Sequence, residues 1–242
     1  MDQLEFLVER WEDQRDIKNL MGKFVNCLLL NRQGEIFEAF FSQRQDVCLT
    51  FNDGSYIGPQ AVRGYYEAAV ERNKLSAKLL QDRLPEKLGG KAEEEIYGIG
   101  PFQVKPLTAP VIEVAEDGET GKGLWFCLGC SAEVTSRGPE ANWTWGYFAG
   151  DFVYEDDSWK IWHLQYLNEI DSLCGQSWGR ELIPYPELPE FAALQEFSYP
   201  EYTVREAVRE LYRVDRPLTA TPRIPEPYKT FSETFSYGRE AV

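Results

Sequence analysis

The single histidine of the chain, His163, lies among aromatic residues and is the side chain best suited to proton transfer near neutral pH. Two aromatic-rich runs, residues 142–154 and 159–166, are joined by a short acidic turn, which predicts an antiparallel hairpin. Side chains alternate between the two faces of a strand, so Trp159, Ile161 and His163 share one face. Because this set carries no charge other than that of His163, we expect it to face the interior.

Three further polar residues are candidates for acting with His163. Tyr147 and Asp151 share a strand face, and Lys105 ends a segment rich in glycine and proline. A tyrosine hydroxyl can donate to a developing oxyanion, a carboxylate can orient an imidazole or take a proton, and a desolvated lysine can act as a base or bind an oxyanion. We therefore expect His163, Tyr147, Lys105 and Asp151 to be catalytic. The alternative for each is a structural role in the core, at the surface or in a loop.

Four other side chains are expected to contact a substrate. Trp145 shares the strand face of Tyr147, and Tyr56, Arg63 and Phe24 belong to segments that precede the hairpin. The chain is 14% aromatic and contains seven tryptophans. This content suits a pocket for a flat apolar ligand, and it suits a dry core equally well.

Three apparent motifs have simpler explanations. Cys127 and Cys130 have the spacing of a redox or zinc pair, but residues three apart on a strand point to opposite faces, and no second pair or nearby histidine completes four ligands. Residues 118–123 are rich in glycine but lack the strand–loop–helix setting of a phosphate loop. Ser131 and Ser136 lack the sequence context of a serine hydrolase. We therefore expect neither a metal nor a cofactor.

The composition argues against several classes of function. Forty acidic and 25 basic side chains among 242 residues give a formal charge of −15, which repels nucleic acid and anionic lipid. No apolar run is long enough to cross a membrane, and the first residues lack the pattern of a signal peptide. Five scattered cysteines do not resemble a disulfide framework. We expect a soluble cytoplasmic protein with no nucleic-acid or membrane partner.

Hydrophobic periodicity predicts helices early in the chain and strands after them. Helical spacing of apolar residues indicates two helical segments within residues 3–30, a short helix at 35–41, and a long helix that begins at Gly58-Pro59 and runs past Leu80. Strands are predicted at residues 47–51, 55–57, 108–115 and 124–135, ahead of the aromatic hairpin, with a long loop over residues 84–105.

After residue 167 the chain becomes rich in proline and aromatic residues. A short helix is predicted at residues 203–212, because Thr203 and Glu206 have the spacing of a capping box. The aromatic residues favour a tail that packs on the body or on a neighbouring subunit. We therefore predict a domain over residues 1–170 and an extended tail over residues 171–242.

The order of these elements resembles the SnoaL-like, or nuclear transport factor 2-like, α+β cone. The resemblance covers roughly residues 10–170. No phrase is diagnostic alone, and the order and spacing make the case. The phrases that carry it lie at residues 14–21, 51–58, 106–114 and 146–153, the last leading to Trp159-Lys-Ile161.

The resemblance implies a curved antiparallel sheet wrapped around helices, with a pocket open at one end. Members of the family include scytalone dehydratase, bile acid 7α-dehydratase, ketosteroid isomerase, polyketide cyclases and lyases that remove formaldehyde from lignin-derived diaryl compounds. They share acid–base chemistry without a cofactor, whereas other members are binding or assembly modules. The dehydratases have an acidic residue near the end of the first long helix and a histidine before a strand. At the first of these positions this chain has residues 27–31, Cys-Leu-Leu-Leu-Asn, and at the second it has Val104-Lys-Pro106. The only histidine, His163, would therefore have to act from another strand.

The resulting hypothesis is a cofactor-independent lyase that removes water or a small carbonyl fragment, such as formaldehyde, from an aromatic or polycyclic hydroxylated molecule. The alternatives are a non-catalytic binding or assembly protein and a double-bond isomerase. We expect a homo-oligomer, a dimer or trimer, because Trp162, Leu164 and Tyr166 are predicted to give the outer sheet face an apolar patch.

Overall fold

A computed structural model describes residues 3–176, 186–213 and 222–239, and its architecture is α+β, as the sequence predicts. Most of the helices come first in the chain, with a β-hairpin between the second and the third. These elements are α1 (Gln3–Leu29), α2 (Gln33–Phe40), β1 (Cys48–Phe51), β2 (Gly54–Ile57), α3 (Pro59–Arg83), α4 (Pro85–Leu88) and α5 (Glu93–Ile96). The sheet follows with β3 (Phe102–Val104), β4 (Leu107–Val114), β5 (Thr120–Thr135), β6 (Gly138–Glu155) and β7 (Ser158–Leu173). Short helices η1 (Pro189–Phe191), α6 (Ala192–Glu196) and η2 (Phe231–Glu233) occur after the sheet.

Three local predictions differ from the structure. Residues 3–29 form one continuous helix rather than two segments. The predicted loop at 84–105 contains α4, α5 and β3. Residues 203–212 contain no helix, because they extend along the hairpin of β1 and β2, where the backbone of Val204 bridges that of Ser55. Tertiary pairing outweighs the local capping signal there.

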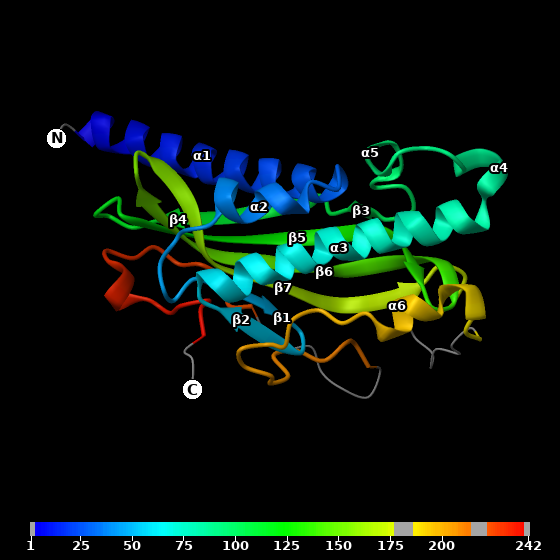
Figure 1. Ribbon diagram of the computed structural model, residues 1–242. Coiled ribbons are helices and arrows are strands. Elements are labelled where there is room, and N and C mark those ends of the chain that lie inside the picture. The colour runs from blue at the N-terminus through cyan, green and yellow to red at the C-terminus, as the bar shows by residue number, and fades with distance from the viewer. Residues whose placement is uncertain (1–2, 177–185, 214–221, 240–242) are drawn as a thin grey trace.

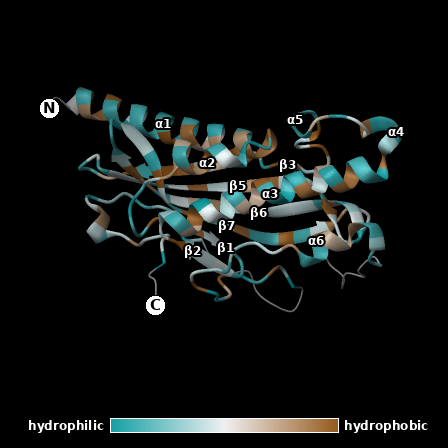
Figure 2. Ribbon diagram, viewed as in Figure 1, coloured by the Kyte–Doolittle hydropathy of each residue, from teal (hydrophilic) through white to brown (hydrophobic). Residues whose placement is uncertain are grey.

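The seven strands form one curved, open sheet with the order β2-β1-β7-β6-β5-β3, and β4 also pairs with β5 (Figure 1). The β1–β7 pair is parallel and the other pairs are antiparallel, so the sheet is mixed rather than purely antiparallel. Helices α1, α2 and α3 lie across one face (Figure 1). Hydrophilic and hydrophobic residues alternate along α1 and α3 (Figure 2), as expected of helices with one buried side. No helix in the described ranges is both long and apolar enough to span a bilayer.

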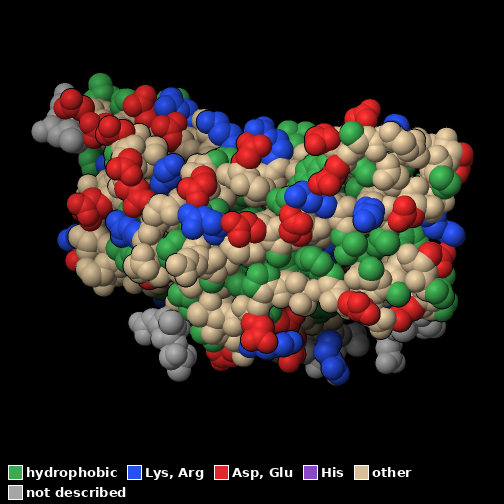
Figure 3. Space-filling view, in the orientation of Figure 1, with side chains coloured by type: hydrophobic (Ala, Val, Ile, Leu, Met, Phe, Trp, Pro, Cys, Tyr) green, Lys and Arg blue, Asp and Glu red, His purple; other side chains and the backbone are tan. Residues whose placement is uncertain are grey.

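The main core lies between these helices and the inner, concave face of the sheet. Phe24 of α1 makes edge-to-face contacts with Phe41 and with Phe148 of β6. Trp125 and Phe152 pack in the same cluster and are almost completely buried. Burying a large aromatic side chain contributes on the order of 2 kcal/mol, so this cluster fixes the helices against the sheet. Acidic and basic side chains are interspersed over the opposite, solvent-facing side of the helices (Figure 3).

A β-bulge in β7 decides which way His163 points. Asp151 pairs with His163, whereas the next residue of β6, Phe152, pairs with Ile161, so Trp162 is an extra residue in β7. Ile161 and Leu164 therefore both belong to the inner core. His163 points to the outer face, where it contacts residues near the C-terminus. The expectation that His163 faces the interior is wrong, because strict alternation fails at the bulge.

The same bulge removes the predicted apolar patch of the outer face. Leu164 is buried in the inner core, and Tyr166 packs against that core. Trp162 remains on the outer face, where the ring of Phe231 covers it at a centroid distance of 4.7 Å. The predicted homo-oligomer was based on this apolar patch, which the structure does not contain. The oligomeric state itself stays a prediction.

Candidate active site

A cavity of about 190 Å³, here called the inner cavity, lies between the helices and the concave face of the sheet. Its apolar wall is formed by helices α1 and α3 together with β1, β6 and β7, and consists of Phe24, Leu28, Leu49, Phe51, Tyr65, Tyr66, Phe148 and Leu164. Its polar wall comes from β3, β5, β6, β7 and the residue after β3, and consists of Gln103, Lys105, Ser131, Glu133, Asn142, Thr144, Tyr166, Asn168 and Asp171. One end can therefore hold an aromatic ring while the other presents hydrogen-bonding groups.

Lys105 is the cation of the inner cavity and is 7% exposed. Its Nζ donates to Thr144 Oγ1 at 2.9 Å and to the Tyr166 hydroxyl, and it lies 4.7 Å from the centre of the Tyr166 ring. Burial lowers the pKa of Lys105, while the negative charges of Asp171 and Glu133 oppose that effect. The tyrosine oxygen accepts from the ammonium, and the Tyr166 side chain also has hydrogen bonds with Thr144 and Asn168.

Asp171 provides a carboxylate on the wall opposite the apolar residues. Burial raises the pKa of Asp171, against the opposing effects of the Lys105 charge and of a hydrogen bond from Asn142 Nδ2 at 3.1 Å. The pKa values of the carboxyl and the ammonium are thus shifted toward each other within one cavity. Oppositely shifted pairs of this kind are typical of acid–base sites.

Two buried acceptors of the inner cavity have no protein donor. In the described part of the chain, Asn142 Oδ1 and Asn168 Oδ1 make no hydrogen bond. A buried unpaired amide oxygen costs about 1–3 kcal/mol. A ligand that donates a hydroxyl proton to either oxygen would remove that cost.

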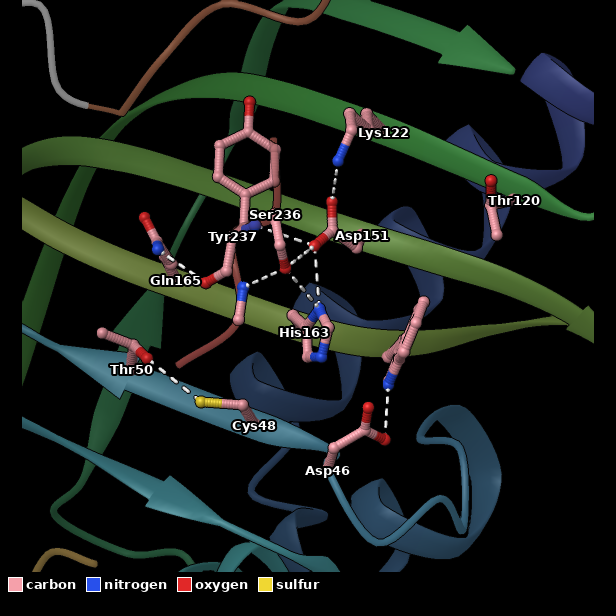
Figure 4. A network of polar contacts seen from close by, with 12 residues as sticks. Asp46, Cys48, Thr50, Thr120, Lys122, Asp151, His163, Gln165, Ser236 and Tyr237 are labelled. Atoms are coloured by element: carbon pink, nitrogen blue, oxygen red, sulfur yellow. Dashed lines mark hydrogen bonds and ion pairs between the residues drawn. The ribbon is translucent and has the colours of Figure 1, made fainter. Parts of the chain in front are cut away.

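On the opposite, outer face of the sheet, Asp151 is the centre of a polar cluster (Figure 4). Its Oδ1 accepts from Lys122 Nζ at 2.5 Å, and its Oδ2 contacts His163 Nδ1 at 2.8 Å and accepts from the Ser236 hydroxyl and the Tyr237 N–H at 2.9 and 2.8 Å. Burial raises the pKa of Asp151, but the His163 hydrogen bond and the Lys122 charge outweigh burial and lower it. We call Lys122, Asp151, His163, Ser236 and Tyr237 the outer-face cluster.

The outer-face cluster differs from a serine nucleophile triad. Ser236 Oγ contacts the same nitrogen, His163 Nδ1, that Asp151 contacts, at 3.2 Å. A triad requires the serine and the carboxylate on opposite ring nitrogens. The cluster is therefore better explained as an attachment for the C-terminal segment 222–239.

Aromatic rings of that segment enclose Lys122. Its Nζ is fully buried, and ring centres lie 4.6 to 5.7 Å from it, contributed by Tyr228, Phe231, Phe235 and Tyr237. Such cation–π contacts are worth up to about 2 kcal/mol each when desolvated. The imidazole of His163 stacks on the ring of Trp162, with centroids 4.4 Å apart. Gly238 packs against the imidazole so closely that a Cβ on Gly238 would lie 2.7 Å from three of its ring atoms.

The structure separates the four predicted catalytic residues. Lys105 lines the inner cavity, whereas Asp151, His163 and Tyr147 belong to the outer face. Tyr147 packs against Leu124, Ala149 and Tyr237, with its ring 4.8 Å from that of Phe126. The expectation that all four lie together in one pocket is wrong, because the side chains of Tyr147 and Asp151 leave β6 on the face opposite Phe148.

The predicted substrate-binding residues are also divided. Phe24 lines the inner cavity, and Tyr56 lines a neighbouring chamber, where its hydroxyl donates to the Pro200 carbonyl at 3.0 Å. Trp145 is 45% exposed on the outer face. Arg63 is paired with Glu38 and lies over the ring of Phe37, and it is not among the residues that line the inner cavity.

The polar residues that the sequence interpretation missed have a recognisable pattern in retrospect. Asn142 and Thr144 alternate with aromatic residues in β6, which is the signal of a polar inner face. Tyr166, Asn168 and Asp171 follow the bulge in β7, and a second register shift lies opposite Trp145 and Gly146. Without the bulges, alternation in β7 assigns Tyr166 and Asn168 to the wrong face, whereas the two bulges cancel for Asp171, which has the parity of Ile161.

No group of three potential metal ligands from His, Cys, Asp and Glu occurs among the residues that the structure describes. Cys127 is buried in the inner core, and Cys130, three residues further along β5, is partly exposed. All five cysteines are free thiols.

Comparisons with known proteins give likeness at the level of structure. No family model matches the sequence, and no curated protein matches it. LinA-type3 hexachlorocyclohexane dehydrochlorinase from Novosphingobium barchaimii LL02 is 13% identical over 73% of this chain and 98% of its own, with a TM-score of 0.46. The Kfla4162 protein from Kribbella flavida is 12% identical over 66% and 93%, with a TM-score of 0.48. An NTF2-like superfamily protein from Salmonella enterica serovar Typhimurium is 12% identical over 64% and 89%, with a TM-score of 0.44.

Proposed function

We propose that this chain is a cofactor-independent lyase that eliminates water, or a small carbonyl fragment, from a hydroxylated aromatic small molecule bound in the inner cavity. The observation that carries the proposal is the juxtaposition of Asp171 with the hydrogen-bonded pair Lys105–Tyr166 in a cavity whose other wall is aromatic. Elimination needs one base, one stabiliser of a developing oxyanion and a water-poor site.

The roles follow from the charges. The Asp171 carboxylate takes a proton from the carbon beside a carbonyl or ring carbon, and the C–H electrons move into the conjugated system. The Tyr166 O–H, with its oxygen bound by the Lys105 ammonium, donates to the oxygen on which negative charge develops. The electron pair then forms the new double bond as the C–O bond breaks, and Asp171 returns its proton to the departing hydroxyl, which leaves as water.

The aromatic wall positions the ring of the substrate. Phe148 is stacked on Tyr166 at a centroid distance of 4.5 Å and meets Phe24 edge-to-face at 6.0 Å. A flat substrate ring can pack against these faces while its hydroxyl donates to Asn142 or Asn168. This arrangement holds the reacting carbon near the polar wall.

Removing the oxyanion donor tests the proposal. Incubating the protein with a panel of β-hydroxy aryl ketones should yield the conjugated enones, detected by their ultraviolet absorbance. In Tyr166→Phe, kcat should fall by roughly 100-fold, because the substitution removes one hydroxyl from the oxyanion site. His163→Ala should retain wild-type kcat, because His163 lies on the other face of the sheet. A wild-type rate in Tyr166→Phe, or a lost rate in His163→Ala, would contradict the proposal.

The pH profile of kcat/KM should be bell-shaped, and narrower than the ordinary pKa values of an aspartate and a lysine would give. Activity rises with pH through the raised pKa of Asp171, which must be ionised, and falls as the pH passes the lowered pKa of Lys105, which must stay protonated. Lys105→Arg should move only the alkaline limb, to higher pH, because guanidinium stays charged. An alkaline limb that stays in place in this variant would exclude Lys105 as its source.

A further inference from the structure

A second and larger chamber opens beside the inner cavity. It has a volume of about 740 Å³ and lies between the sheet and residues 198–211 of the C-terminal part of the chain. The inner cavity and this tail chamber share five wall residues, which mark the junction between them: Phe51, Tyr65, Tyr166, Asn168 and Asp171.

The wall contributed by residues 198–211 is fastened to the sheet. Val204 exchanges backbone hydrogen bonds with Ser55 of β2. Asn52, in the turn between β1 and β2, accepts at its carbonyl from the N–H groups of Val208 and Arg209 and donates from Nδ2 to the Arg209 and Asn168 carbonyls. The wall is therefore a built part of the fold.

Tyrosine rings line the chamber in matched pairs. Tyr199 is stacked on Tyr65 of α3, with centroids 5.2 Å apart and planes at 24°, and Tyr202 lies 4.8 Å from Tyr56 of β2. One member of each pair comes from the cone and the other from the C-terminal segment. Removing that segment would leave half of this aromatic surface.

The volumes indicate how a ligand would be divided. A cavity of roughly 150 Å³ accepts a benzene molecule, so the inner cavity, at about 190 Å³, has room for one substituted ring. Anything longer must extend past the junction. Asn168, with its unpaired Oδ1, lies on the wall at that point and can accept from a hydroxyl near the link.

We propose that the tail chamber is a second substrate subsite, in which Tyr199 and Tyr202 act as specificity-determining residues by holding a second aromatic ring of the substrate. The proposal rests on the proposed function for its reacting end, and it adds that the C-terminal segment completes the site. Substrates are then selected by length, because a one-ring molecule leaves the tyrosine surface uncovered.

The test compares a one-ring and a two-ring phenol. Affinities of para-cresol and para-hydroxybibenzyl are measured by isothermal titration calorimetry with the full-length protein. The wild type should bind the two-ring phenol more tightly. In Tyr199→Ala its affinity should fall by roughly ten-fold while that of para-cresol changes less than about two-fold. Tyr199→Phe should preserve the preference, and Tyr154→Ala, at an exposed tyrosine of β6, is the matched control.

A second variant moves the wall without removing a ring. A Cβ on Gly54 would lie 2.6 Å from the Tyr202 ring and 2.7 Å from the Val204 carbonyl oxygen, so Gly54→Ala should displace the segment and reduce the two-ring preference. Equal affinities of the two phenols for the wild type, or a preference unchanged in Tyr199→Ala and Gly54→Ala, would overturn the proposal.

The outcomes separate the two proposals. If Tyr166→Phe loses enone formation while Tyr199→Ala keeps the preference for the two-ring phenol, the proposed lyase reaction is supported and the second subsite is excluded. If the preference depends on Tyr199 while Tyr166→Phe keeps full turnover, the subsite stands and the proposed chemistry fails.

Discussion

In Asp171→Asn, kcat should fall by about two to four orders of magnitude, the range in which a positioned general base contributes. The amide keeps the shape of the carboxylate and can still bond with Asn142, which donates to Asp171 at 3.1 Å. It cannot take a proton. KM should change little, because the side chain acts on the reacting carbon rather than on the ring.

The matched control is Asp156→Asn. Asp156 lies in the turn between β6 and β7 with a φ of 50°, a conformation that asparagine adopts readily. Circular dichroism and thermal unfolding should be unchanged in both variants. If Asp171→Asn kept its rate at neutral pH, the base would have to be another group of the inner cavity, with Glu133 the remaining carboxylate there.

The free energy of unfolding should fall by about 3–5 kcal/mol in Asp151→Asn, because the substitution leaves the Lys122 ammonium buried without its counter-charge. Urea denaturation measures the change. Asp16→Asn, which alters an exposed carboxylate paired with Arg15, should cost no more than about 1 kcal/mol.

A double variant separates charge burial from packing. In Lys122→Met with Asp151→Asn, no charge is left buried in the pair, so part of the lost stability should return. Limited proteolysis should cut residues 222–239 faster in Asp151→Asn than in the wild type, and Gly238→Ala should do the same through its contact with His163. If the double variant were less stable than Asp151→Asn alone, the unpaired ammonium would not be the cause of the loss.

The helical character of residues 3–29, the helices α2 and α3, the long strands and the α+β class could be predicted, because each depends on local periodicity. The short helices α4 and α5 have too few residues to show a period and were missed. Phe24 and Lys105 were predicted as site residues, and both line the inner cavity. The faces of β7 could not be predicted, because a bulge depends on pairing with β6 rather than on the residues of β7 alone. The tail was expected to pack on the body or on a neighbour. In the structure, Tyr237 of that tail is 2% exposed against the outer face of its own sheet.

The bulge at Trp162 decides which polar side chains the sheet offers to the helices. If β7 paired with β6 without this bulge, the register beyond Ile161 would slip by one residue, and every later side chain of β7 would exchange faces up to the next register shift. Leu164 and Tyr166 would then turn outward, and His163 and Gln165 would face the helices. One bulged residue therefore determines whether the inner face of this strand presents a tyrosine or a histidine.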